Sequence, residues 1–155
     1  MELNCNSRIA FVCRGGPENG PFSAAAAAVI HEELVRRGLK LSGIYVCSGS
    51  VATALLGCTG ELDRLCTLWA NIKPEDIVGQ VTKLRTMYRA ITKESLFRSD
   101  ALGKFIRKHW DLDAIFSPGA VPIKIPALDL LTNELIIFSN KNPKHKRWFP
   151  EGVLG

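Results

Sequence analysis

The segment that decides the fold is Gly43-Ile44-Tyr45-Val46-Cys47-Ser48-Gly49-Ser50-Val51-Ala52. Residues 43–47 form a short apolar run that is typical of a buried strand, and residues 51–56 follow an apolar helical pattern. The three small residues between them, Ser48, Gly49 and Ser50, leave room for a tight bend. The segment therefore predicts a strand that turns sharply into a helix.

A similar unit precedes it. Residues 8–13 (RIAFVC) predict another buried strand, and residues 14–20 (RGGPENG) form a loop by composition. Residues 22–37 predict a helix, which ends at Arg36-Arg37-Gly38. Its expected apolar face comprises Ala25, Val29, Ile30 and Leu34. Two strands joined through a helix of this length predict a parallel sheet with helices on its faces, which is an α/β fold.

Further elements are expected downstream. Helices are predicted at 61–70, from Pro74, at 82–90 and at 99–110, and a short strand at 114–116. Residues 121–130 and 134–138, separated by Thr132-Asn133, predict a strand hairpin. With no repeat and no linker, residues 1–155 are expected to form a single domain, which we expect to be incomplete at its C-terminus.

Composition limits the class of protein. Hydrophobic residues make up 46% of the chain and charged residues 23%, which is typical of a globular domain. No apolar run is long enough to cross a bilayer, and the N-terminus lacks the pattern of a signal peptide. The five cysteines show no metal-ligand spacing and are expected to be reduced thiols in the cytoplasm.

A serine in the bend is a candidate nucleophile. In the G-x-S-x-G turn of serine hydrolases the hydroxyl stands clear because the residues two before and two after it are small. Around Ser50 these residues are Ser48 and Ala52, both small, whereas around Ser48 one of them is Val46. We therefore favour Ser50 over Ser48, with an ordinary turn and helix cap as the alternative.

The loop after the first strand is a candidate oxyanion site. Acyl transfer needs backbone N–H donors aimed at the developing oxyanion, and Gly15 and Gly16 permit a close backbone approach. The loop is not a P-loop, because Pro21-Phe22 follows Gly20 in place of Lys and Ser or Thr. The dinucleotide pattern G-x-G-x-x-G is absent as well.

In combination these motifs resemble the patatin-like phospholipase family. Arg14-Gly15-Gly16-Pro17-Glu18-Asn19-Gly20 is similar to the family's G-G-G-x-R-G oxyanion loop. Ser48-Gly49-Ser50-Val51-Ala52 is similar to its G-x-S-x-G turn, and residues 127–134 (ALDLLTNE) are similar to its T-D-L-x-T-G-E hairpin. The chain departs from the family pattern at Pro17, Asn19 and Ala52.

The resemblance implies a three-layer α/β/α fold with a mainly parallel sheet. It also implies a lipid acyl hydrolase that works through an acyl-enzyme, without metal or cofactor. Ser50 would attack the ester carbonyl, and the Gly15 and Gly16 amides would hold the oxyanion. The base would be an aspartate in a D-G-[GA] motif beyond Gly155, so the chain alone would be inactive or nearly so.

Three alternatives stay open. A Ser–His–Asp triad would use Ser50, Asp129 and His145. A degenerate hydrolase would bind an acyl chain or a partner without catalysis. The basic segment 141–149 (KNPKHKRWF) would suit nucleic acid or an anionic membrane surface. Of these partners we expect an acyl-ester lipid and peripheral membrane contact, and no nucleic acid.

Overall fold

The computed structural model describes residues 7–16, 19–73, 76 and 99–147, and for 99–103 the backbone alone. The strands are β1 (Ile9–Cys13), β2 (Leu41–Val46), β3 (Ile123–Asp129) and β4 (Glu134–Ser139). The helices are α1 (Gly20–Arg36), α2 (Val51–Gly57), α3 (Leu62–Asn71), α6 (Ser99–His109) and α7 (Leu112–Ile115). Two short 3₁₀ turns, η2 (Ser48–Ser50) and η3 (Pro143–Lys146), complete the described elements.

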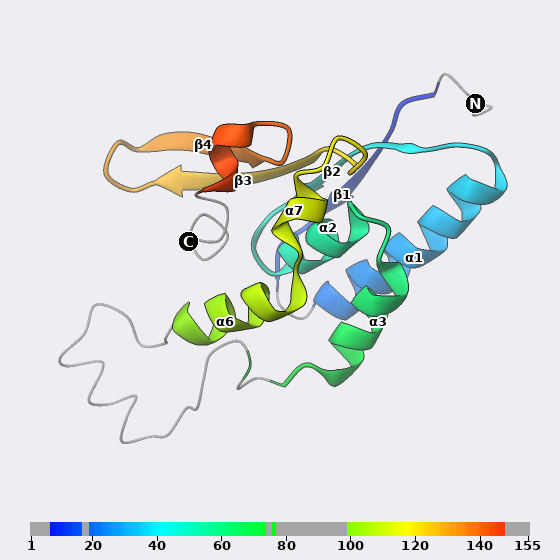
Figure 1. Ribbon diagram of the computed structural model, residues 1–155, viewed down its shortest axis with the longest axis horizontal. Helices are drawn as coiled ribbons and strands as arrows, with labels where there is room; N and C mark the ends of the chain where they lie inside the picture. The colour runs from blue at the N-terminus through cyan, green and yellow to red at the C-terminus, as the bar shows by residue number, and fades with distance from the viewer. Residues whose placement is uncertain (1–6, 17–18, 74–75, 77–98, 148–155) are drawn as a thin grey trace.

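The strands form one sheet in the order β1-β2-β3-β4 (Figure 1). β1 pairs parallel with β2, and β2 pairs parallel with β3, while β3 and β4 form an antiparallel hairpin. The expectation of an α/β protein with a mostly parallel sheet is confirmed. The strand-turn-helix segment and the 121–138 hairpin are confirmed with small shifts of their ends.

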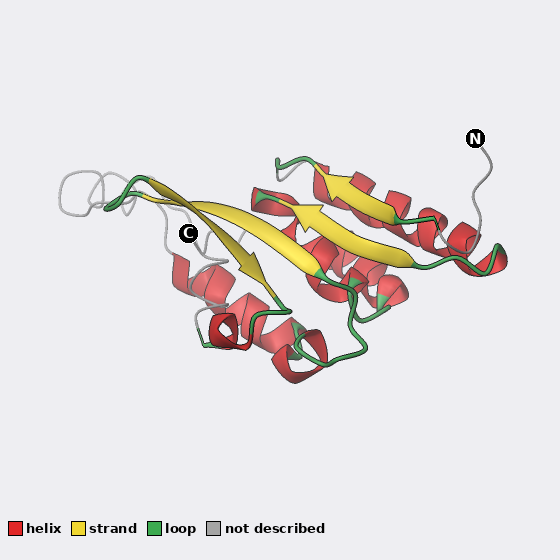
Figure 2. Ribbon diagram, turned by 90° about the horizontal axis from the view of Figure 1, so that it is seen from above, coloured by secondary structure: helices red, strands yellow, loops and turns green. Residues whose placement is uncertain are grey.

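The described helices lie on one side of this sheet (Figure 2). Side chains that point toward them are buried, such as Ile44 and Val46 on β2. Alternate side chains point to the opposite face, where Val12 is 74% exposed and Tyr45 39% exposed. The described residues therefore show two layers, and a third layer would have to cover the face of Val12 and Tyr45.

Helix α1 packs against the sheet through small alanine side chains. Ala24 and Ala27 are buried in its contact face, and Leu34 is buried one turn from its end. The face expected from the sequence is wrong except at Leu34, because Ala25, Val29 and Ile30 are exposed. Five consecutive alanines give little periodicity, so the sequence does not distinguish which of them face the core.

The short strand expected at 114–116 is wrong, because residues 112–115 form helix α7. The carboxylate of Asp111 accepts hydrogen bonds from the N–H groups of Asp113 and Ala114, which caps this helix. Three consecutive apolar residues, Ala114 to Phe116, are too few to distinguish a helix from a strand. The helices expected from Pro74 and at 82–90 lie outside the described residues.

Asn140 connects the end of the hairpin to the rest of the sheet. Its side chain is buried, its Oδ1 accepts from the Ile123 N–H at 2.9 Å, and its Nδ2 donates to the carbonyl oxygens of Ile115 and Val121. Lys141 follows it and donates to the carbonyl oxygen of Ala120 at 2.7 Å. These bonds satisfy the backbone of the segment that enters β3 and so hold β3 beside β2.

Candidate functional site

The glycine loop and the Ser48–Ser50 turn lie at the same edge of the sheet. Cys13 and Val46 are register partners at the carboxyl ends of two parallel strands. Arg14-Gly15-Gly16 follows β1 and Cys47-Ser48 follows β2, so these two segments begin side by side. Open α/β sheets bind ligands at this edge.

Ser50 does not project from the turn. Its residue is 0% exposed, and its hydroxyl lies 2.9 Å from the carbonyl oxygen of Cys47 and 3.1 Å from that of Arg14. The expectation of an open hydroxyl at position 50 is therefore wrong. The reason is that Ser50 is already the residue before α2, so its side chain turns inward and ties the ends of β1 and β2 together.

Ser48 has two of the features expected of the turn residue, although Val46, two residues before it, is not small. It is exposed, and its φ angle is 51°. The other described non-glycine residue with a positive φ is Asn133, in the hairpin turn, where asparagine tolerates that conformation. A serine held in this region at a strand-to-helix bend matches the strained turn on which serine hydrolases carry their nucleophile. Its side chain has no hydrogen-bond partner within the described ranges.

Gly15 packs directly against the turn. A β-carbon at position 15 would lie 3.0 Å from the β-carbon of Ser48, and 3.2 Å from both the carbonyl oxygen and the Sγ of Cys47. Only a glycine allows the two backbones to come this close without displacement. The glycine loop therefore packs against the turn at Ser48 and Cys47, whereas the sequence analysis expected it to face an open Ser50.

Asn19 organises the glycine loop. Its Nδ2 donates to the carbonyl oxygen of Gly15 at 3.0 Å, and its N–H donates to the carbonyl oxygen of Gly16 at 3.1 Å. Gly16 has a φ of 121°, which a residue with a side chain rarely adopts. Both carbonyl groups are thus used inside the loop, while neither glycine N–H has an acceptor in the part of the chain that is described. Of the two glycines, Gly15 lies directly against Ser48.

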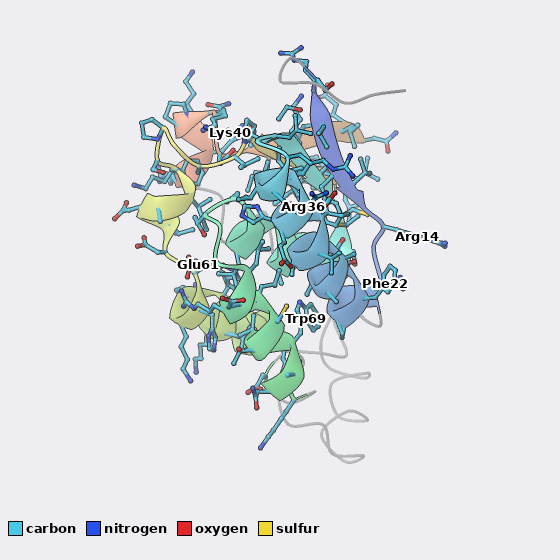
Figure 3. All side chains as sticks on the ribbon, turned by 90° about the vertical axis from the view of Figure 1, so that its right-hand side faces the viewer. Arg14, Phe22, Arg36, Lys40, Glu61 and Trp69 are labelled. Atoms are coloured by element: carbon cyan, nitrogen blue, oxygen red, sulfur yellow. The ribbon has the colours of Figure 1, made fainter. Side chains whose placement is uncertain are left out.

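Helix α1 begins immediately after this loop. Its first residue, Gly20, is buried against the indole ring of Trp69 from α3. Figure 3 labels Trp69 where α3 meets the N-terminal end of α1, with Arg14 projecting away from the helices. The positive end of the α1 dipole is thereby held next to the glycine loop.

Cys47 also belongs to this site, although the apolar run 43–47 predicts a buried strand residue there. It is half-exposed, and its Sγ faces Gly15. The signal in the sequence was its position as the last apolar residue before the Ser-Gly-Ser bend. Cys13, at the end of β1, is buried, and burial raises the pKa of its thiol to about 11, against a smaller opposing hydrogen bond from Ser23.

The triad of Ser50, Asp129 and His145 is not assembled. Asp129 lies at the turn of the hairpin, where its carboxylate accepts from the N–H groups of Leu131 and Thr132. His145 accepts from the N–H of Ser139, at the opposite end of the same hairpin. Five residue steps of strand separate these ends, which corresponds to roughly 16 Å.

The basic segment is partly used within the protein. The ammonium of Lys141 donates to three backbone carbonyl oxygens, and that of Lys146 pairs with Asp113. Lys144 stays exposed, while Trp148 and Phe149 lie outside the described residues. The segment therefore offers less free positive charge than its sequence suggests.

In the described ranges, no cluster of His, Cys, Asp or Glu side chains is large enough to hold a metal ion. Within the same ranges, every helix is too short or too polar to cross a bilayer. No protein-family model, no curated protein and no solved structure matches this chain.

Proposed function

We propose that this chain belongs to a serine acyl hydrolase of the patatin-like kind, in which Ser48 rather than Ser50 is the nucleophile. One observation carries the proposal: Ser48 is exposed at a left-handed backbone position directly against Gly15. This is the geometry that acyl transfer needs, because the attacking oxygen and the donors for the oxyanion must flank the same carbonyl group.

The proposed reaction proceeds through an acyl-enzyme. The Ser48 hydroxyl adds to the ester carbonyl carbon as its proton passes to a base, and the negative oxygen accepts hydrogen bonds from the Gly15 and Gly16 amides. Collapse of this intermediate expels the alcohol, which takes up the proton, and water then hydrolyses the ester of Ser48. By the resemblance to the family the base is an aspartate, and we place it outside the described residues.

The substrate class and the finer fold are part of the same proposal. The resemblance favours an acyl-ester lipid, and a three-layer arrangement would cover the sheet face that carries Val12 and Tyr45. Peripheral contact with a membrane would bring the substrate to the site. No step of the proposed reaction uses a metal or a cofactor.

A fluorophosphonate probe, which labels activated serines, tests the proposal on the full-length protein. We expect labelling of the wild type, loss of labelling in Ser48→Ala, and retention in Ser50→Ala, which alters the same turn. Cys47→Ala should also retain the label. Absence of labelling in the wild type, or labelling that survives Ser48→Ala, would overturn the assignment.

A non-catalytic fold that binds an acyl chain is the second candidate. The observation that favours it is that no described Asp, Glu or His side chain is hydrogen-bonded to Ser48. Under this alternative the wild-type protein stays unlabelled although it folds.

A further inference from the structure

A cleft of about 640 Å³ lies between α3 and α6, away from the Ser48 turn. One wall is α3, which contributes Arg64 and Leu68, and the other is α6, which contributes Phe105 and Lys108. Its volume is in the range of small-molecule sites, about 300–1,000 Å³. None of the described residues of the glycine loop or of the Ser48 turn lines it, so we treat it as a separate site.

The deeper part of the cleft is apolar. Leu68 is buried, and Ile72 and Phe105 are half-buried. The Phe105 ring is fixed by an edge contact with Trp110, at 5.9 Å between ring centroids. An apolar surface that is already held in place suits an alkyl chain, because little ordering is needed when the chain binds.

The rim of the cleft is basic. Lys104 and Lys108 stand one helical turn apart on α6, both exposed, and Arg64 faces them from α3. The opposing charge on the lining is Asp76, whose carboxylate accepts from the Lys73 N–H. Arg64 is paired with Glu61, so Lys104 and Lys108 against Asp76 leave an excess of one positive charge at the entrance.

Arg64 holds the two walls together. Its guanidinium pairs with Glu61 and donates to the carbonyl oxygen of His109 at 2.6 Å, at the end of α6. The pKa of His109 is lowered, first by burial and then by the charges of Lys108 and Arg64, against a smaller opposite effect of Asp76. Lys108 and Arg64 therefore lie close enough to the imidazole to disfavour its charged form.

We propose that this cleft binds a long-chain alkyl anion, with its chain on Leu68, Ile72 and Phe105 and its carboxylate or phosphate group at Lys104 and Lys108. The apolar floor suits the alkyl chain of such a ligand, and the basic rim suits its charged head group. A free phosphate ion has nothing to place on the apolar floor, and a nonionic alkyl compound leaves the cationic rim unpaired. No reactive step is involved, so the proposal is independent of the hydrolase.

The test is isothermal titration of the full-length protein with dodecanoate and with dodecyl phosphate, each below its critical micelle concentration. Two further probes are controls. Inorganic phosphate is the head group alone, and decyl maltoside carries an alkyl chain without charge. We expect saturable binding of one molecule of each alkyl anion and at least a roughly tenfold weaker response to the other two probes.

Variants place the binding in the cleft. Lys104→Glu combined with Lys108→Glu should weaken dodecanoate binding by roughly tenfold or more, because two attractive charges become repulsive. Arg107→Glu is the matched control: it is exposed on the same helix but does not line the cleft, so its affinity should stay within about twofold of wild type. Circular dichroism confirms that both variants fold.

Equal weakening in the two variants, unchanged binding in both, or inorganic phosphate binding as tightly as dodecanoate would overturn the proposal. Ser48→Ala separates it from the hydrolase, since removal of the proposed nucleophile should leave the affinity for dodecanoate unchanged. Failure of fluorophosphonate labelling would likewise leave the titration result intact.

Discussion

The β-carbon of Ser48 lies 3.0 Å from the point where a side chain on Gly15 would begin. This distance is shorter than most carbon–carbon contacts in proteins, and the neighbouring atoms on that side are the backbone and thiol of Cys47. The two segments at the carboxyl ends of β1 and β2 are therefore fitted to each other, and a change in one displaces the other.

Gly15→Ala should destabilise the protein by about 1–3 kcal/mol, because the added methyl group forces Ser48 and Cys47 away. Gly119→Ala is the control, since a β-carbon there has no heavy atom within 4 Å. At such a site alanine should be neutral or stabilising by up to about 1 kcal/mol. Urea unfolding followed by circular dichroism measures both, and similar effects of the two substitutions would refute the close packing.

Ser50→Ala should cost about 1–3 kcal/mol of unfolding free energy, because the buried hydroxyl is the donor to the strand-end carbonyl oxygens of Cys47 and Arg14. Ser48→Ala removes an exposed hydroxyl and should change stability by no more than about 0.5 kcal/mol. The same unfolding assay compares the two. A larger loss in Ser48→Ala than in Ser50→Ala would contradict the assigned roles.

Gly20→Ala should also be strongly destabilising, although alanine normally favours a helix by about 1 kcal/mol over glycine. The added β-carbon would fall 2.2 Å from the ring of Trp69, so the ring or the helix α3 that carries it would have to shift. A double-mutant cycle with Trp69→Leu checks the cause. The loss from Gly20→Ala should be smaller in the Trp69→Leu background, and additive effects would exclude the ring as its origin.

Thiol reactivity should follow burial. Burial raises the pKa of Cys13 to about 11 and that of Cys58 to about 12, whereas Cys66 is exposed. At pH 8 a disulfide reagent should therefore modify Cys66 of the folded protein on the order of 100-fold faster than Cys13 or Cys58. Peptide mapping by mass spectrometry identifies the sites, and fast modification of Cys58 would be the contrary result.

The same pKa shifts imply a loss of stability at alkaline pH. An unfolded thiol ionises near 9.0, while the buried thiols of Cys13 and Cys58 stay neutral until about 11 and 12. Their contribution is complete below pH 9 and is lost as the pH rises from 9 toward 12. The urea midpoint should fall across that range, and Cys58→Ala should flatten the dependence.

The amino-acid sequence by itself determined the local elements. The apolar run before Ser48, the glycines after Cys13 and the hairpin around Asn133 predict their strands and turns because side-chain size and backbone freedom act over a few residues. The parallel sheet followed from the strand-helix-strand order, because such a connection returns to the same edge.

Only the tertiary structure decided which hydroxyl is exposed. Ser48 and Ser50 are the same residue type in the same bend. The carboxyl end of β1 lies on the inner side of that bend, toward which Ser50 turns. The carbonyl oxygens of Cys13, Arg14 and Cys47 converge on Ser50 and leave Ser48 outside. The cleft between α3 and α6 depends on contacts between residues far apart in the sequence, such as Arg64 and His109, which are 45 residues apart, and no local pattern encodes such a contact.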